Sequence, residues 1–346
     1  MNRRTFCSSI MAAANAAFSG AAFAFKAKIR VAVIGTAHGH AASKVRALQQ
    51  LPVFELAGVC RPPGEPEVAV PGVRRLSADE VVNDASIELV AVETRVEHNL
   101  DYAERCVRAG KHVHLDKPPG GSLPRLRALF DDAARHGPTV QMGYQWRYHP
   151  AMQLAIEAAR KGWLGHVYSM RAVIDKPLGA AERLELAKFP GGILFDEGCH
   201  LIDRAIDLFG KPKRATGFLQ HSSTIDDGLA DNTLAVLEYD RARVEIGMAS
   251  FQPHGSLYRV LELSGTNGKA VVQPYAPLRL LVDLKEPAGP YKSGAQALEP
   301  QEPAGPAYAP DFLEMAQIIR HGARPSYSPE HDLIVHQTLL QVCRQK

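Results

Sequence analysis

Short apolar runs alternate with segments of helical periodicity along the first 145 residues. The apolar runs are rich in β-branched residues and end near glycine or a polar turn, as buried strands do. They span residues 28–35, 54–60, 87–92, 111–115 and 139–144. Apolar residues three and four positions apart predict helices between them, at 36–51, 98–109 and 122–136. This alternation predicts a doubly wound, mostly parallel α/β sheet over residues 25–145.

The rhythm changes after residue 150. Helices are predicted at 151–161 and 193–209, on either side of an extended segment at 167–174. Strand-like stretches with few helical breaks follow, at 214–219, 233–239, 243–251, 258–264 and 270–273. We therefore expect an α+β domain with a large, mainly antiparallel open sheet over residues 146–310.

The last part of the chain is predicted to return to helix. Residues 285–310 are rich in proline, glycine and alanine, a composition typical of an irregular loop. Helices are predicted at 310–321 and from a cap at Ser328 to about residue 344. We expect the segment 311–346 to pack back on the first domain.

The first 24 residues have the pattern of a signal peptide. Arg3 and Arg4 form a twin-arginine pair, a moderately apolar run covers residues 10–23, and Ala22-Phe23-Ala24 offers a cleavage site between small residues. We expect export by the twin-arginine route to the periplasm, or a cytoplasmic protein if this segment is not a functional signal.

Composition narrows the class of protein only slightly. A chain of 346 residues with 46% hydrophobic residues is expected to form two soluble domains. The formal net charge of +3 becomes close to neutral without Arg3 and Arg4, so charge gives no argument for nucleic-acid or membrane partners. The five cysteines lack paired or metal-type spacing, and no disulfide framework is expected.

The first strand leads into a degenerate glycine loop. Gly35 ends the strand, and the turn Thr36-Ala37-His38-Gly39-His40 opens a helix, so free backbone amides can face a pyrophosphate. Ala37 replaces the second glycine of the dinucleotide-binding motif and His40 the third. At the end of the second strand, Arg61 stands where a ribose-binding acid is expected, which favours NADP or a loosely bound adenosine.

Two further stretches carry candidate chemistry. Lys117 follows Asp116 and precedes two prolines at the carboxyl end of a predicted strand, where open α/β sheets bind ligands. Asp196 and His200 are four residues apart on a predicted helix, so both side chains leave one face. A carboxylate beside an imidazole suits a general base, and a fixed ammonium suits a developing alkoxide.

These stretches together resemble the glucose–fructose oxidoreductase and inositol dehydrogenase (Gfo/Idh/MocA) family. The matching pieces are residues 32–35, Thr94 with His98, residues 109–118, residues 143–148 and residues 191–203. The resemblance implies a Rossmann domain and an α+β domain whose open sheet often forms homo-oligomers. It also implies hydride exchange between NAD or NADP and a carbon of a sugar, polyol or glycoside.

The resemblance also implies roles for individual residues. Lys117 is expected to touch the reacting hydroxyl, His200 to be the acid–base group and Asp196 to orient it. Tyr144 and Arg147 are expected to contact the substrate together with Asp196 and His200. Cofactor contacts are expected from Gly35, Thr36, Ala37, His38, Gly39, Arg61, Thr94, His98, Asp116 and Lys117.

The sequence departs from the family pattern near the cofactor. Asp116 replaces a glutamate, Arg95 replaces a proline, and the ribose acid is absent. An exported enzyme would also need a tightly bound cofactor that is regenerated in each cycle. Either one sugar is oxidised while another is reduced, or a glycoside is cleaved without net redox change.

Two other functions fit parts of the sequence. The pairs His38-Gly39-His40 and His112-Val113-His114, the second with Asp116 close by, have a spacing that can chelate a metal, although we expect none. A non-catalytic sugar-binding protein that kept only the Rossmann shell would explain the degenerate glycine loop.

Overall fold

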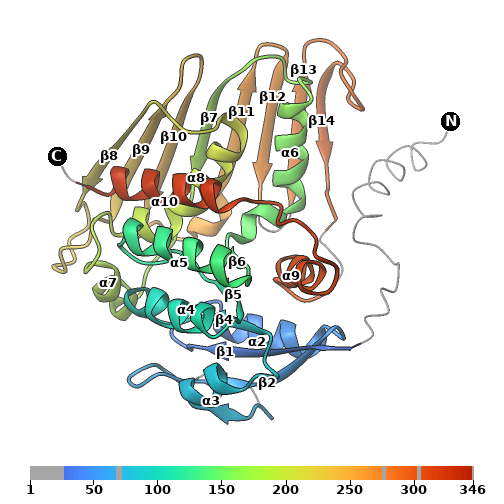
Figure 1. Ribbon diagram of the computed structural model, residues 1–346. Coiled ribbons are helices and arrows are strands. Elements are labelled where there is room, and N and C mark those ends of the chain that lie inside the picture. The colour runs from blue at the N-terminus through green and yellow to red at the C-terminus, as the bar shows by residue number, and fades with distance from the viewer. Residues whose placement is uncertain (1–26, 68–71, 275–277, 302–304, 345–346) are drawn as a thin grey trace.

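The chain folds into two domains, each built on one sheet (Figure 1). The computed structural model describes residues 27–67, 72–274, 278–301 and 305–344. The predicted signal peptide at residues 1–24 lies outside them. Within the described ranges, no helix is both long and apolar enough to cross a membrane.

The first domain is a parallel six-stranded sheet in the order β3-β2-β1-β4-β5-β6. This is the doubly wound order of the Rossmann fold, so the predicted fold class is confirmed. The strands are β1 (Ile29–Ile34), β2 (Phe54–Cys60), β3 (Arg75–Leu76), β4 (Leu89–Val92), β5 (His112–Leu115) and β6 (Val140–Met142). Its central strands are fully buried, as near-continuous apolar runs require.

Helices cover both faces of this sheet, and their ends follow local sequence signals. Ser77 and Glu80 form a capping box at the start of α3, and Ser122 caps α5 before a proline. Gly137 ends α5 in the left-handed region. The helices are α2 (Ala41–Gln50), α3 (Ala78–Asn83), α4 (Asn99–Arg108) and α5 (Leu123–His136), with short 3₁₀ turns η1 (Val96–His98) and η2 (Gln145–Tyr148).

The second domain is an eight-stranded sheet in the order β14-β13-β12-β11-β7-β10-β9-β8. Its strand pairs are antiparallel except for β7 and β10, which run parallel. The strands predicted from the sequence are β7 (Val167–Val173), β8 (Arg214–Gln220), β9 (Asn232–Glu238), β10 (Arg243–Ala249), β11 (Val260–Gly265) and β12 (Gly268–Gln273). A 3₁₀ turn, η3 (Gly255–Tyr258), precedes β11.

Three elements of this domain were not predicted from the sequence. They are the strands β13 (Arg279–Leu284) and β14 (Gly294–Leu298) and the helix α7 (Ala180–Leu186). The prediction of an irregular loop over 285–310 is wrong for β14, because its backbone pairs with β13 whatever its small side chains prefer. The helix α7 has no capping side chain, so its start carries no sequence signal.

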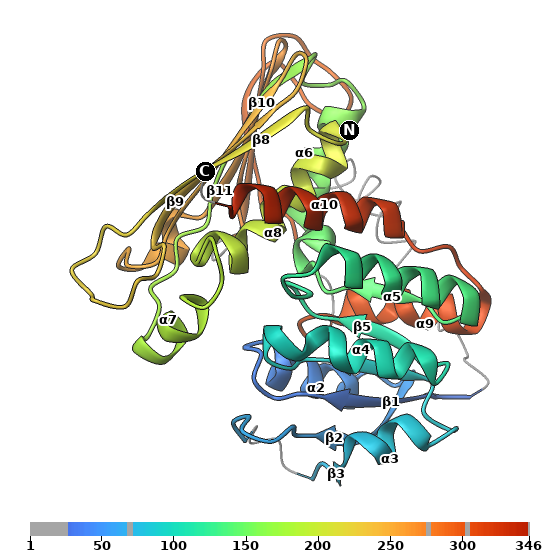
Figure 2. The same cartoon turned by 60° about the vertical axis from the view of Figure 1, so that its left-hand side comes forward.

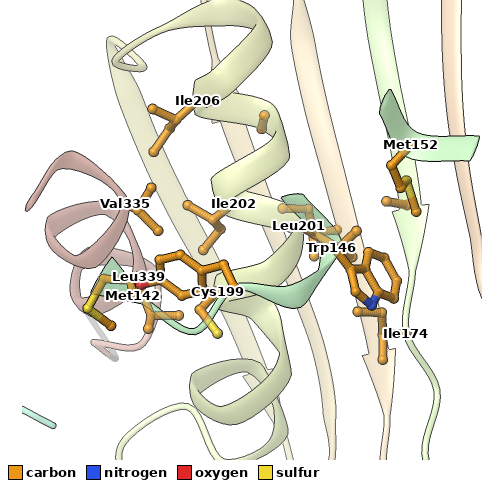
Figure 3. Close-up of a cluster of buried hydrophobic side chains, with 14 of the residues drawn as sticks. Met142, Trp146, Met152, Ile174, Cys199, Leu201, Ile202, Ile206, Val335 and Leu339 are labelled. Carbon is orange, nitrogen blue, oxygen red and sulfur yellow. The ribbon is translucent and has the colours of Figure 1, made fainter. Parts of the chain in front are cut away.

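The long helix α8 (Ile193–Phe209) lies between the two sheets and is buried over most of its length (Figure 2). Its apolar side chains meet α10 (Pro329–Val342) on one side and the segment around Trp146 on the other (Figure 3). A second helix, α6 (Pro150–Arg160), covers β11 to β13. One continuous hydrophobic core thereby joins the two domains and holds α8 in place.

The two C-terminal helices pack on different partners. The helix α9 (Ala309–His321) covers the Rossmann face that carries α2, where Phe312 packs edge-on against Phe54. The helix α10 lies along α8 and β8 and also reaches α5 (Figure 2). The C-terminal segment thus braces both domains rather than the first alone.

The sheet face opposite α6 and α8 exposes apolar side chains. Phe218, Leu234 and Leu281 project from it, and Leu234 borders a shallow hollow of about 200 Å³. An exposed apolar sheet surface is typical of contacts between protein copies. The homo-oligomer expected from the sequence stays a prediction.

We predict that Gly217→Ala lowers the free energy of unfolding by about 1–3 kcal/mol, because a side chain there overpacks the contact between β8 and α10. A Cβ at position 217 would lie 1.7 Å from the Val342 carbonyl oxygen. Gly179→Ala is the control, since Gly179 has ordinary backbone angles and open space around it. Thermal denaturation measures both, and equal stability of the two variants would contradict the described docking of α10.

Candidate functional site

A cavity of about 820 Å³ opens between the carboxyl ends of the Rossmann strands and the helices α7 and α8. The first domain contributes the loop from Ala37 to His40, Thr94, and Lys117. The second domain contributes Lys176 and residues from α7 and α8, including Asp196 and Glu197. The site therefore exists only where the two domains meet.

The glycine loop presents backbone amides toward this cavity. Gly35 has a φ of +106°, and a Cβ there would lie 2.3 Å from the backbone carbon of Glu93 and the amide nitrogen of Thr94, so only glycine fits. The loop residues Ala37, His38 and Gly39 line the cavity, as predicted for cofactor contacts. The amides of Thr36 and Ala37 already bind an anion, the carboxylate of Glu65.

Lys117 lies at the end of β5, on a turn whose Lys117–Pro118 bond is cis. Asp116 Oδ1 accepts the Lys117 backbone amide at 2.6 Å, which fixes the turn. The Lys117 ammonium donates to Asp196 Oδ1 and to the Asp196 carbonyl, both at 3.1 Å. Burial alone would lower the pKa of Lys117, but Asp196 and Glu197 outweigh it and raise this pKa, so the ammonium stays charged.

Asp196 does not orient His200, contrary to the prediction from their spacing. No hydrogen bond or ion pair joins the two side chains within the described chain; the Asp196 carboxylate faces Lys117 instead. The carboxylate beside His200 is Glu197, whose Oε2 lies 4.0 Å from His200 Nε2 and 3.9 Å from Lys117 Nζ. Glu197 Oε2 therefore stands between the two predicted catalytic groups.

His200 is buried behind Glu197 and is not among the residues that line the cavity. Its ring stacks on Trp146, with centroids 5.8 Å apart, and within the described residues neither ring nitrogen has a hydrogen-bond partner. Burial and the Lys117 ammonium hold the pKa of His200 well below its ordinary value, although Glu197 acts the other way. The imidazole is therefore neutral near pH 7.

Asp116 anchors a buried cluster under the glycine loop. Its Oδ2 lies 2.9 Å from His38 Nδ1, 3.0 Å from His40 Nδ1 and 2.8 Å from Lys44 Nζ. Lys44 also donates to Glu93 at 2.7 Å. Burial alone would raise the pKa of Asp116, but His38, Lys44 and His40 hold it well below its usual range.

This cluster bears on the metal-site alternative. His38, His40 and Asp116 lie close enough to share an ion, whereas His112 and His114 bond to Thr139 and Gln141. Burial and Asp116 raise the pKa of Glu93 well above its usual range, despite Lys44. The Lys44 ammonium already pairs with both carboxyl groups, 2.7 Å from Glu93 and 2.8 Å from Asp116. The cluster thus contains its own cation, the Lys44 ammonium, next to the carboxylate that a metal ion would need.

Arg147 and Tyr144 are not placed to contact a substrate in the cavity. Arg147 is buried, donates to Asp203 Oδ1 at 2.7 Å from Nη2 and 3.0 Å from Nε, and also bonds Asp332 on α10. Its guanidinium lies over Tyr144, and neither side chain lines the cavity. Arg147 therefore joins η2 to α8 and α10 through a buried ion cluster. The prediction that Arg147 contacts the substrate is not supported by this placement.

The remaining predicted cofactor residues divide into two groups. Thr94 is buried at the cavity wall and bonds Asn99, whereas His98 is exposed and pairs with Asp101 outside the cavity. Thr36 and Arg61 line a second cavity of about 310 Å³ at the end of β2, together with Arg74 and Arg75. Three arginines thus gather where the adenosine end of a dinucleotide would lie.

Sequence reasoning missed several residues of the site. Glu197 is the residue after Asp196 on α8. No motif predicts that its carboxylate lies beside Lys117. Lys176 follows β7 and donates to Glu197 at 3.2 Å and to Glu182 at 2.7 Å. No sequence motif predicts its place in the site. Glu65 lies in a proline-rich turn, and no pattern there predicts a buried acid.

Comparison with known proteins agrees with this geometry. A family model described as "Oxidoreductase family, NAD-binding Rossmann fold" matches residues 29–144, and one for the GFO/IDH/MocA C-terminal domain matches residues 152–271. The chain belongs to the GFO/IDH/MocA oxidoreductase family. The predicted family is confirmed, and with it an NAD-binding Rossmann domain.

Curated members of this family include both uncharacterised and named enzymes. The Escherichia coli oxidoreductase YhhX is 27% identical over 76% of this chain and 79% of its own. A Bacillus subtilis scyllo-inositol 2-dehydrogenase (NADP⁺), IolW, is 27% identical over 43% of each chain. A mouse trans-1,2-dihydrobenzene-1,2-diol dehydrogenase is 27% identical over 60% of this chain and 62% of its own. The chain thus covers less than two thirds of the two named dehydrogenases.

Solved structures of family members share the fold. A structure of the oxidoreductase yhhX has a TM-score of 0.75 at 21% identity, over 92% of this chain and 97% of that one. An Agrobacterium radiobacter oxidoreductase, solved with NAD⁺, L-tartaric acid and magnesium, has a TM-score of 0.75 at 15% identity, over 90% and 94%. At these identities the likeness concerns the fold.

The hydrogen-bond donors and charged groups that line the cleft suit the parts of a nicotinamide dinucleotide. The glycine loop supplies amides for a pyrophosphate, the smaller cavity supplies arginines for the adenosine end, and the larger cavity leads to Lys117. Among these loop amides, those of Thr36 and Ala37 donate to Glu65 in this structure.

We predict that Arg147→Ala lowers the free energy of unfolding by about 3–5 kcal/mol, because it leaves Asp203 and Asp332 buried without their cation. Arg160→Ala is the matched control: the Arg160 side chain is half-exposed and Asp207 keeps its pair with Arg204, so the change should cost less than about 1 kcal/mol. Chemical denaturation measures both. Unchanged stability together with a raised KM in Arg147→Ala would instead favour the substrate contact expected from the sequence.

Proposed function

We propose that the protein is an NAD(P)-dependent oxidoreductase that exchanges a hydride with a hydroxyl-bearing carbon of a sugar, polyol or glycoside. The observation that carries the proposal is the Lys117 ammonium. It is buried, charged and held at the carboxyl end of β5, at the wall of a cavity that begins at the glycine loop. Ordinary structural lysines lie at the surface, so a charged lysine here calls for a functional reason.

Lys117 would bind the reacting oxygen. When a hydride leaves a carbinol carbon, the oxygen gains negative charge as its proton departs, and a fixed cation stabilises that charge. The bound nicotinamide would supply the hydride acceptor. Asp196 and Glu197 keep the ammonium protonated and directed into the cavity, so Lys117 acts as a cation and not as the base.

The proton would pass by way of Glu197 to His200. A hydroxyl at Lys117 lies beside Glu197 Oε2, which is 4.0 Å from the neutral His200 ring. In the neutral imidazole one ring nitrogen carries a hydrogen and the other can accept a proton, and among the described residues neither nitrogen has a hydrogen-bond partner. Glu197, and not Asp196 as expected, would then be the carboxylate beside the imidazole, and His200 would keep the role of base.

The cavity chemistry favours a neutral substrate with several hydroxyl groups. Its wall alternates ammonium and carboxylate groups, which donate to and accept from hydroxyls: Lys117, Lys176, Glu182, Asp196 and Glu197. Two relatives are named for an inositol and for a diol, both of which carry more than one hydroxyl group. The arginines Arg61, Arg74 and Arg75 favour NADP, since guanidinium groups suit a 2′-phosphate.

The test is to denature the purified protein and measure released NAD(H) and NADP(H), and to titrate the native protein with each. We expect bound or bindable NADP(H). A folded protein that releases none, and gains no thermal stability from added cofactor, would contradict the proposal and favour a non-catalytic binding protein.

We predict that Lys117→Ala and His200→Ala each reduce turnover by at least about a hundredfold, because the first removes the cation that stabilises the developing alkoxide and the second removes the base. Cofactor content should stay close to that of the wild type. Lys213→Ala, an exposed lysine on the second domain, is the control. Near-normal rates in either variant would refute the role given to that residue.

A further inference from the structure

Glu65 is a buried acid in the turn that follows β2. Its Oε2 accepts the backbone amides of Thr36 at 2.6 Å and Ala37 at 3.1 Å, and its Oε1 accepts the amide of Arg95 at 3.0 Å. Only 3% of the residue is exposed. A carboxylate that accepts several backbone amides in a buried place is held by strong, charge-assisted hydrogen bonds.

The amides that Glu65 occupies are those at the opening of the glycine loop. Backbone donors at this turn, before α2, are the ones that bind a dinucleotide's pyrophosphate in this fold. A carboxylate and a phosphate oxygen require the same donors and carry the same sign of charge. The two cannot share Thr36 and Ala37.

Glu65 also stands at the junction of the two cavities. Thr36 lines the smaller one, with Arg61, and Ala37 lines the larger one, which leads to Lys117. An extended dinucleotide that places its adenosine end in the first and its nicotinamide in the second has to cross this junction. The Glu65 carboxylate lines the larger cavity and bonds Thr36 at the smaller one, so it lies on that path.

Arg95 holds the turn in this position from three directions. Its amide binds Glu65, its Nη2 donates to the Gly64 carbonyl at 3.0 Å, and its Nη1 lies 2.9 Å from Glu185 of α7. A proline at position 95 would have no N–H to give to Glu65. The turn is thereby tied to the helix that walls the substrate side of the cavity.

We propose that Glu65 is an internal competitor of the cofactor: its carboxylate closes the pyrophosphate site, Arg95 latches it there, and a dinucleotide binds only by displacing it. The inference rests on the proposed function for the identity of the ligand. It adds that the protein on its own is held in a closed state and that its cofactor affinity is set by the strength of this latch.

The experiment compares the affinity of the full chain and its variants for NADP⁺ and NAD⁺ by isothermal titration calorimetry at fixed salt. Glu65→Ala should bind at least about tenfold more tightly than the wild type, since a competing charged hydrogen bond is removed. Glu55→Gln is the control, because it removes one negative charge from β2 outside both cavities. It should bind like the wild type.

Arg95 gives a second, independent pair of variants. Arg95→Pro removes the amide donor as well as the guanidinium and suits the local φ of −56°, whereas Arg95→Ala keeps the amide. Arg95→Pro should bind the dinucleotide more tightly than Arg95→Ala. This order follows from the loss of the bond to Glu65 and does not require Glu65 to be changed.

The outcomes separate this inference from the proposed function. If the wild type and Glu65→Ala bind with equal affinity, Glu65 does not compete and the inference fails while the proposed function stands. Weaker binding by Glu65→Ala would make Glu65 a ligand of the cofactor and would also overturn the inference. If all the variants are folded and none binds a dinucleotide, both proposals fail.

Discussion

The contact between Lys117 and the start of α8 is the interaction on which the site depends. A lysine buried alone would lose its charge, because the cost of removing an ammonium from water is several kcal/mol. The carboxylates of Asp196 and Glu197 offset that cost, and they come from the other domain. The charge at the centre of the cavity therefore exists only while α8 stays against the Rossmann strands. The shared core between α8, α10 and the Trp146 segment holds it there (Figure 3).

On the cofactor side of the cleft, buried polar groups are also satisfied by partners within the protein, but here the donors belong to the loop and the partner is a carboxylate. Backbone amides at the glycine loop need an acceptor, and Glu65 satisfies them in the protein by itself. Below the loop, the Asp116 carboxylate pairs with the Lys44 ammonium and lies within 3.0 Å of a ring nitrogen of His38 and of His40. The two halves of the cleft are thus both electrostatically complete without a ligand. On the proposed displacement of Glu65, a dinucleotide would exchange this carboxylate for its own phosphate groups, so the contacts of Glu65 would contribute to cofactor affinity.

The fold could largely be predicted from the sequence, because its elements carry strong local signals. The strands from Ile29 and Phe54 are continuous apolar runs, and Ser77, Ser122 and Gly137 mark helix ends through hydrogen bonds within a few residues. The strand β14 and the helix α7 lack such signals. A partner strand fixes β14, and ion pairs of Arg183 with Asp227 and Asp231 hold α7, and neither kind of contact is visible in a local window.

The site was predicted less completely, for a related reason. Motif residues such as His38, Lys117 and Asp196 do line one cavity, but the direction of each side chain depends on partners distant in the sequence. The spacing of Asp196 and His200 allowed a contact, yet Lys117 lies closer to the carboxylate and takes it. Arg147 matched a substrate-binding residue by its position in the sequence, but it forms ion pairs with Asp203 of α8 and Asp332 of α10 instead. Spacing on one helix cannot reveal such competition between elements.

The most direct test of the account is a crystal structure of the protein with NADP⁺ bound. The account predicts that the nicotinamide ring lies in the larger cavity beside the Lys117 ammonium, with Glu197 and His200 on the far side of the substrate position. A dinucleotide bound elsewhere, or a nicotinamide separated from Lys117 by packed side chains, would contradict it.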